Sequence, residues 1–254
     1  MNGRYLYCIV KGSERVELGN IGIENSDVYA IPYNGLSAIV HDCHAEPYRS
    51  ENKEIVKDWV VAHQKVVDAA WKRFGTVLPI GFDTIIRGRD GANSEENMRD
   101  WLKEDYENLN AKLKNIKGKA EYCVQIFWDS EVMAQKFAEE SVEIKKLSEE
   151  IKSKPRGLAY MYRQKLEGIL KKEMVNKADQ YFKEFYDKIK PCVDDLRVEK
   201  TKKTEAENKQ MFINLSCLIT EDGSRELGDE LEKIDTMDGF SVRYTGPWPP
   251  YSFV

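Results

Sequence analysis

Residues 211–219 read MFINLSCLI, the most regular alternation of apolar and other residues in the chain. Successive side chains of a β-strand point to opposite faces of the sheet, so a period of two predicts a strand with one apolar face. The residues on that face are Met211, Ile213, Leu215, Cys217 and Ile219. The segments on either side of this strand indicate the fold to which it belongs.

These neighbouring segments carry further strand and helix patterns. They predict a strand at Tyr122–Trp128, a charged helix at Glu131–Ile151, a long helix between Pro155 and Pro191, a short strand at Leu196–Glu199, a short helix around Leu227–Ile234 and a last strand at Phe240–Thr245. The order is βαββαβ, the ferredoxin-like arrangement. Its helical region is longer than that fold needs, so we expect part of it to protrude.

The long predicted helix carries many charged residues. Its lysines are Lys165, Lys171, Lys172 and Lys177, and Glu167, Glu173 and Asp179 lie beside them. Opposite charges three or four residues apart on a helix can pair on its surface. We therefore expect an ordinary solvated face with salt bridges along this helix.

The first half of the chain also mixes strands and helices. It predicts strands at Tyr5–Val10, Asp27–Ile31 and Leu36–His41 with a turn at 32–35, a helix from Asn52 to Phe74, an extended segment at Val77–Phe82, and a helix from Asn93 to Ile116. Gly75 follows the first helix as a terminating glycine. Glu96 is placed to complete a capping box with Asn93.

A polar stretch with a glycine, residues 116–119, separates the two halves. The predicted fold class is therefore α+β with two domains, an N-terminal mixed domain at 1–117 and a C-terminal ferredoxin-like domain at 118–245 with its helical extension. A Pro- and aromatic-rich tail at 246–254 completes the chain.

This tail is stiff and apolar. Pro247, Pro249 and Pro250 favour an extended backbone, and Trp248, Tyr251 and Phe253 supply large apolar side chains. Burial of each such side chain contributes roughly 1.5–3 kcal/mol. We predict that these six residues pack at the seam between the two domains, and the alternative is that they dock on a partner.

Composition excludes several classes of protein. The net charge of −5 argues against a dedicated nucleic-acid binder, which usually has a basic surface. The apolar runs are too short to span a bilayer, and no signal peptide is visible, so we expect a soluble cytoplasmic chain. The five cysteines form no CxxC pair and suggest neither a zinc ribbon nor a disulfide framework.

Two histidine-containing features are the candidates for chemistry. His41-Asp42-Cys43-His44 is the densest group of possible metal ligands, but a strand would divide these side chains between two faces, and no second cluster completes a site. His63 lies on the apolar face of the first helix and is either an acid or base in a cleft or a structural histidine. We expect the structural role, and we assign no catalytic, cofactor-binding or metal residue.

The chain resembles the gas vesicle accessory proteins GvpF and GvpL almost end to end. The residues that carry the resemblance are Tyr5–Val10, Gly35–Val40, the stretch from His63 to Thr84, Gly157–Met161 and Thr245–Phe253. The tail is the most specific of them. Asp83 departs from the pattern, because the family more often has glycine there.

The resemblance implies a non-enzymatic role in gas vesicle assembly. Members of this family are minor components that bind the hydrophobic shell protein GvpA and other accessory proteins, and they are placed at the gas-facing side of the shell. Their C-terminal domain is a modified ferredoxin-like fold. The resemblance implies no cofactor and leaves open the F or L role, the surface that contacts GvpA and the oligomeric state. A ferredoxin-like domain that binds a small molecule or RNA remains the alternative.

Overall fold

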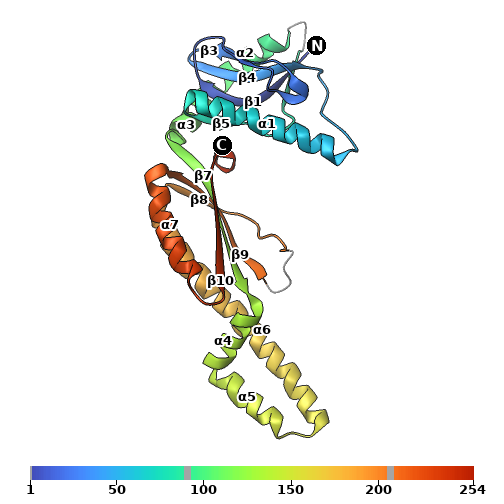
Figure 1. Cartoon of the computed structure of the whole chain (residues 1–254), viewed down its shortest axis with the longest axis vertical. Helices are drawn as coiled ribbons and strands as arrows, with labels where there is room; N and C mark the ends of the chain where they lie inside the picture. The colour runs from blue at the N-terminus through green and yellow to red at the C-terminus, as the bar shows by residue number, and fades with distance from the viewer. Residues whose placement is uncertain (1, 89–92, 205–208) are drawn as a thin grey trace. The chain divides into compact units, whose positions relative to one another are not determined.

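The computed structural model describes residues 2–88, 93–204 and 209–254. The chain divides into two compact units, one formed by Met1–Glu121 with Pro247–Val254 and one formed by Tyr122–Gly246. Both units contain helices and strands (Figure 1). The α+β fold class that the sequence predicts is therefore confirmed.

The first unit is built on an antiparallel sheet. Its strands are β1 (Gly3–Lys11), β2 (Glu17–Gly19), β3 (Val28–Tyr33), β4 (Leu36–Cys43), β5 (Val77–Pro79) and β6 (Ile85–Arg87). They lie in the order β2-β3-β4-β1-β5, and β6 also pairs with β1. The central strand β1 is buried over most of its length, as expected from its continuous apolar run.

The turn between β3 and β4 is tighter than the sequence predicts. We expected a turn over residues 32–35, but Tyr33 pairs with Leu36, so only Asn34 and Gly35 form the turn. Their φ angles are 44° and 84°. Two successive positive φ values define the type I′ hairpin turn, which asparagine and glycine adopt most easily.

A bulge in β1 sets the direction of its side chains. The register with β4 shifts between Leu6 and Cys8. Tyr5 and Tyr7 therefore share one core cluster with Cys8, although strict alternation would place Tyr7 and Cys8 on opposite faces. The bulge thus adds Cys8 to the face that Tyr5 and Tyr7 already share by alternation.

Three helices pack on this sheet. They are α1 (Lys53–Phe74), α2 (Ser94–Glu104) and α3 (Tyr106–Asn115). The Asn52 side chain caps α1, which ends at Gly75 with φ 72°. Asn93 and Glu96 form the predicted capping box of α2. These ends confirm the sequence-based boundaries.

The prediction of a single helix from Asn93 to Ile116 is wrong. Asp105 has φ −98° and ψ 12°, and it separates α2 from α3. Its carboxylate accepts hydrogen bonds from the Asn108 amide. Aspartate favours such local contacts over a helix interior, which explains the break.

The second unit contains the ferredoxin-like sheet. Its strands are β7 (Lys119–Asp129), β8 (Asp195–Val198), β9 (Lys209–Thr220) and β10 (Phe240–Trp248), in the order β10-β7-β9-β8. With helices after β7 and with α7 (Glu221–Asp235) between β9 and β10, this is the βαββαβ arrangement. The strand β10 extends three residues beyond the predicted end at Thr245.

A helical extension departs from this sheet (Figure 1). It comprises α4 (Ser130–Glu140), α5 (Val142–Lys152) and α6 (Arg156–Ile189), with α5 packed along α6. The prediction of one helix at Glu131–Ile151 is wrong, because Ser141 ends α4 and its hydroxyl caps α5 by accepting from the Ile144 N–H. The long helix α6 confirms the prediction of a protruding helical region.

Aromatic side chains join the base of this extension to the sheet. Phe185 of α6 lies 5.1 Å from Phe240 of β10 between ring centroids, at an interplanar angle of 80°. Tyr181 meets the same Phe240 ring at 5.0 Å. Edge-to-face contacts of this kind add to the burial of apolar area. The C-terminal half of α6 is therefore part of the core, whereas its N-terminal half contacts α5.

Candidate interaction site

The C-terminal tail is anchored by a buried carboxylate. The Ser252 backbone N–H donates to Glu121 Oε2 at 2.7 Å, and the Ser252 hydroxyl donates to Oε1 at 2.6 Å. Glu121 is only 6% exposed. A buried carboxylate is costly unless its oxygens accept hydrogen bonds, so these two contacts satisfy a strong local requirement.

The six tail residues predicted to pack fall into two groups. Phe253, Pro249 and Pro250 are buried, whereas Pro247 is exposed and Trp248 and Tyr251 are 48% and 36% exposed. Burial raises the pKa of the Tyr251 hydroxyl. The tail belongs to the first unit. Its packing at a seam between the two units stays a prediction.

Sequence reasoning missed Glu121. It lies near the start of β7, just before the predicted strand Tyr122–Trp128, and alternation places it on the same face as Cys123, Gln125 and Phe127. No local pattern shows that the C-terminus returns to cover it. The one available signal is a carboxylate directly before the predicted strand Tyr122–Trp128, in which only Gln125 is strongly polar.

A buried tyrosine–histidine network lies between β1, β4 and α1. The Tyr5 hydroxyl is 2.9 Å from His63 Nδ1, and the Tyr7 hydroxyl is 2.8 Å from His41 Nδ1. The His41 Nε2 atom lies 3.0 Å from the Tyr48 hydroxyl. His41 is fully buried, and His63 is 4% exposed.

Backbone N–H groups also donate to both tyrosine hydroxyls. The Asp83 N–H donates to the Tyr5 hydroxyl and the Ile23 N–H donates to the Tyr7 hydroxyl, each at 3.0 Å. Each hydroxyl therefore has its own proton free to donate to a histidine Nδ1. We assign both imidazole protons to Nε2, which leaves both rings neutral.

The pKa values agree with this assignment. Burial lowers the pKa of His41 to about 4 and that of His63 to about 4, and the Ile80 backbone acts in the opposite direction on His63. Burial also raises the pKa of both Tyr5 and Tyr7. At neutral pH the network therefore consists of uncharged groups and acts as a hydrogen-bonded part of the core.

Asp83 joins this network from a strained position. Its φ is 66°, in the left-handed region, and its Oδ1 accepts the Tyr48 backbone N–H at 2.9 Å. Glycine adopts this conformation without cost, but it has no side chain to accept the bond. Aspartate at this position therefore has an unfavourable backbone conformation, but its side chain forms a hydrogen bond that fixes the backbone at Tyr48.

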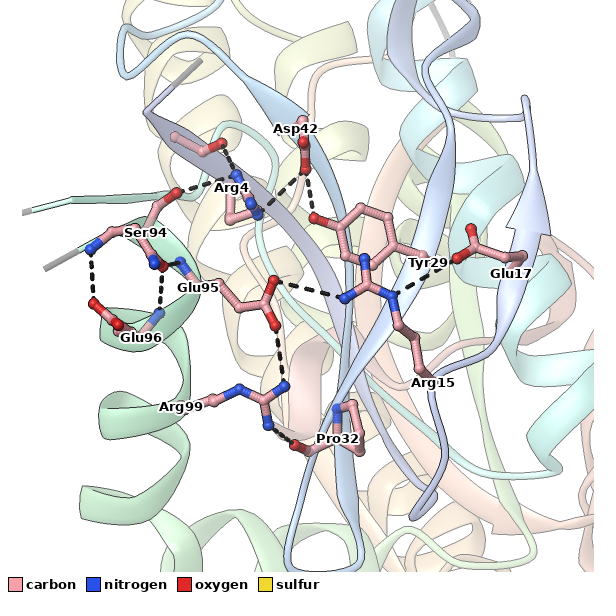
Figure 2. A network of polar contacts seen from close by, with 12 residues as sticks. Arg4, Arg15, Glu17, Tyr29, Pro32, Asp42, Ser94, Glu95, Glu96 and Arg99 are labelled. Atoms are coloured by element: carbon pink, nitrogen blue, oxygen red, sulfur yellow. Dashed lines mark hydrogen bonds and ion pairs between the residues drawn. The ribbon is translucent and has the colours of Figure 1, made fainter.

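A second polar network, shown in Figure 2, joins α2 to the opposite face of the sheet. The Arg4 Nε atom is 3.2 Å from Asp42 Oδ1, and Arg4 Nη1 donates to the Ser94 hydroxyl at 3.1 Å. Arg4 and Tyr5 are adjacent in β1, and neighbouring side chains of a strand point to opposite faces. Tyr5 meets α1, so α2 covers the other side.

Two further arginines complete this network. The Arg15 guanidinium stacks over the Tyr29 ring at 4.4 Å and lies 3.6 Å from Glu95. Arg99 pairs with the same Glu95 at 3.0 Å and donates to the Pro32 carbonyl at 2.6 Å. These contacts bind the first turns of α2 to β3, which is a structural function.

The structure also places the side chains of residues 41–43, which we considered from the sequence as possible metal ligands without assigning a metal site. His41 is directed into the tyrosine network and Cys43 lies in the core, while Asp42 faces Arg4 on the other side. Residues 2–88, 93–204 and 209–254 contain no group of three or more His, Cys, Asp or Glu side chains that could hold a metal ion. Among the same residues, no helix is both long and apolar enough to cross a bilayer.

Two grooves open on the first unit. One of about 590 Å³ is lined by residues of β1, α1 and α3 that include Lys11, Phe74 and Leu113. The other, of about 250 Å³, includes Tyr48 and Trp59. His63 lines neither groove, and its side chain is enclosed by Tyr5, Tyr7 and Phe82.

Exposed apolar side chains gather on helices. On α1 they are Ile55, Val60 and Val61, with exposed fractions between 41% and 45%. On the helical extension they are Val142, Leu158, Tyr160, Met161 and Val175, with exposed fractions between 48% and 81%. Single exposed apolar side chains are normal on a protein surface, so only those that share one helix face indicate contact with other molecules.

Comparison with known proteins gives a consistent result. The family model described as gas vesicle synthesis protein GvpL/GvpF matches residues 3–254. Gas vesicle protein L1 of Halobacterium salinarum is 34% identical, over 99% of this chain and 90% of its own length. Gas vesicle protein F of Nostoc sp. is 22% identical, over 99% of this chain and 98% of its own length.

Solved structures show the same fold. The crystal structure of GvpF from Anabaena sp. superposes with a TM-score of 0.77 at 21% identity and covers 100% of this chain and 98% of its own. GvpF from Microcystis aeruginosa superposes with a TM-score of 0.66 at 20% identity and covers 100% and 99%. Because the family model spans nearly every residue, this chain belongs to the gas vesicle synthesis protein GvpL/GvpF family.

Proposed function

We propose that this chain is a non-enzymatic accessory protein of gas vesicle assembly that binds the hydrophobic shell protein GvpA and other accessory proteins. The observation that carries this proposal is the family match over residues 3–254. A match of that length takes in both units and the tail, so it is not the result of one shared domain. Family membership supports the assembly role. The binding of GvpA and of other accessory proteins is the part that we propose.

A physical requirement explains why such a protein is needed. A shell subunit that exposes an apolar face to gas will aggregate in water before it is assembled. A soluble chain can cover that face temporarily and release it at the growing shell. This chain combines 33% charged residues with the exposed apolar side chains of α1 and α6.

The chemistry of the buried network supports a non-enzymatic role. A general acid or base needs a pKa near the working pH and access to a substrate. His41 and His63 are enclosed, and burial keeps the pKa of each at about 4. The network is therefore suited to holding β1, β4 and α1 together rather than to proton transfer.

A light-scattering assay tests the binding of GvpA. Shell protein diluted from denaturant is followed with and without an equimolar amount of this protein, and a serum albumin control measures general crowding. We expect slower growth of scattering and recovery of a soluble complex by size exclusion. Equal scattering in the presence of this protein and albumin contradicts the proposal.

Location in the vesicle is a separate part of the proposal. We place the protein at the gas-facing side of the shell, after a soluble stage in the cytoplasm. Intact vesicles should then protect it from protease and from a membrane-impermeant biotin reagent, and collapsed vesicles should expose it. Equal labelling of intact and collapsed vesicles places it on the outer side instead.

Loss of the gene gives the cellular test. Cells without it should lack refractile vesicles, and a plasmid copy should restore them. Normal vesicles in the deletion strain contradict an assembly role.

A further inference from the structure

The outer face of α6 carries a strip of exposed residues. The six positions recur at intervals of three and four over residues 158–175, and at about 100° per residue they fall on one side of the helix. They are Leu158, Met161, Lys165, Gly168, Lys172 and Val175. We refer to this set as the α6 strip.

The strip is exposed, and it lies opposite the packed face of α6. Leu158, Met161 and Val175 are 48%, 68% and 61% exposed. On the other side of the helix, Ala159 is buried and Leu166 is half-buried. The apolar residues of the strip are therefore not the contact of α6 with α5.

The spacing of the strip is that of a coiled-coil seam. Leu158, Lys165 and Lys172 are seven residues apart, and so are Met161, Gly168 and Val175. Two such rows, offset by three, correspond to the a and d positions of a heptad repeat. Over 18 positions the strip is about 26 Å long, which is enough for five turns of a partner helix.

Gly168 supports close approach by another backbone. Glycine inside a helix is unfavourable relative to alanine. A Cβ atom built at Gly168 would have no heavy atom within 4 Å, so packing within the chain does not explain the residue. Contact with a partner does, because glycine allows another backbone to come near.

Charge defines the partner. The sequence suggested a salt-bridged helix surface, yet the ion pairs of the described residues include neither Lys165 nor Lys172. The α6 lysines that do pair lie outside the strip: Lys177 pairs with Glu140 of α4 at 3.3 Å, and Lys188 pairs with Glu184 at 2.6 Å. Two unpaired lysines at a positions select a partner that supplies carboxylates.

A second copy of the chain does not fit this surface. An antiparallel pair of strips, centred between Lys165 and Gly168, would set each Lys165 opposite the other copy's Gly168, so the two lysines would lie in adjacent layers about 4.5 Å apart along the axis. A parallel pair would place Lys165 against Lys165 and Lys172 against Lys172. Like charges at these positions disfavour both arrangements.

We propose that the α6 strip binds an acidic amphipathic helix of a partner protein. The apolar residues of that helix pack on Leu158, Met161 and Val175, and its carboxylates meet Lys165 and Lys172. This inference deepens the proposed accessory role, because it assigns a surface and a partner chemistry to it. It rests on that role for its biological setting, but its test needs no shell protein.

The test uses the full chain and a labelled synthetic peptide of three heptads. The peptide has leucine at a and d and glutamate at e and g, and a control peptide has lysine at e and g. Fluorescence anisotropy should show saturable binding of the acidic peptide and at least tenfold weaker binding of the basic one. Absence of saturable binding, or equal binding of both peptides, overturns the proposal.

Matched variants locate the contact. Lys165→Glu with Lys172→Glu should weaken acidic-peptide binding at least tenfold. Lys145→Glu with Lys152→Glu, exposed on α5 at the same spacing of seven, makes the same change in net charge and should alter binding less than threefold. If the α5 pair weakens binding as much as the α6 pair, the strip is not the site.

Circular dichroism of each variant shows whether it is folded.

Sedimentation velocity tests whether a second copy of the chain occupies the strip. If the protein dimerises and Met161→Asp dissociates the dimer, a second copy covers the strip and the proposal is wrong. If the protein fails to bind GvpA but still binds the acidic peptide, the proposal for the α6 strip is supported and the proposed binding of GvpA is wrong.

Discussion

Ser252 and Glu121 are 131 positions apart in the sequence, and they form two hydrogen bonds of 2.7 and 2.6 Å. The backbone N–H and the hydroxyl of Ser252 bind the two oxygens of one buried carboxylate. Glu121 begins the passage into the second unit, and Ser252 lies in the tail that returns to the first. The pair therefore joins the returning tail to the last residue of the first unit before the second unit begins.

Glu121→Gln should reduce stability. The amide replaces one accepting oxygen with a donor that faces the donors of Ser252, so a charged hydrogen bond is lost. We expect a loss of about 1.5–3 kcal/mol. Thermal unfolding measures it, with the exposed Glu167→Gln on α6 as the control. Equal melting temperatures for the two variants contradict a structural role of Glu121.

Truncation after Thr245 should lower the melting temperature markedly, because it removes the buried Pro249, Pro250 and Phe253. Phe253→Ala alone should cost about 3–5 kcal/mol, the usual range for a buried phenylalanine. Trp248→Ala is the matched control, since its side chain is 48% exposed, and it should cost less than half as much. An unchanged melting curve combined with loss of GvpA binding would identify the tail as a partner contact.

Stability should fall as the pH falls from about 6.5 to 4. The pKa of His41 and of His63 is about 4 in the folded chain, below the value of 6.5 for a free histidine. Between these pH values the unfolded chain binds protons that the folded chain does not, so acid favours unfolding. Each histidine contributes a slope of about 1.4 kcal/mol per pH unit.

Urea unfolding at pH 7.5, 6.0 and 5.0 measures this dependence. Above pH 7 both states carry neutral histidines, and the histidine contribution to the slope disappears. His63→Gln removes one titrating group and should roughly halve the loss between pH 6.0 and 5.0. A stability that is constant between pH 6.5 and 5.0 is incompatible with two buried neutral histidines.

Substitutions at Asp83 should follow a definite order. Asparagine tolerates the left-handed φ of 66° and can still accept the Tyr48 N–H, so Asp83→Asn should be close to the natural chain. Asp83→Gly relieves the backbone but loses the hydrogen bond. Asp83→Ala loses the bond and keeps the strain, and it should be the least stable, by about 1–3 kcal/mol. Urea unfolding at pH 7.5 ranks them, and an alanine variant as stable as the asparagine variant contradicts this account.

Local patterns were sufficient for most secondary structure. The alternation of Met211–Ile219 predicted β9, and the Asn93–Glu96 capping box predicted the start of α2. Both depend on residues within one element, which is why sequence resolves them. The breaks at Asp105 and Ser141 were missed because the apolar periodicity continues across each of them. At each break one side chain accepts a local hydrogen bond that interrupts the helix.

The sequence by itself determined the α+β class, the βαββαβ order of the second half, the long helix and the apolar character of the tail. It also carried the resemblance to the family. Composition, period and capping are properties of neighbouring residues, and the chain encodes them directly.

Only the tertiary structure decided which polar residues are buried and which lysines are left unpaired. Glu121 directly precedes a predicted strand and is buried against Ser252, while Lys165 was expected in a salt-bridged surface and lies in an open strip. His63 forms a hydrogen bond with Tyr5, which is 58 positions away in the sequence. Such contacts join residues distant in sequence, so their geometry is set by packing and cannot be read from local pattern.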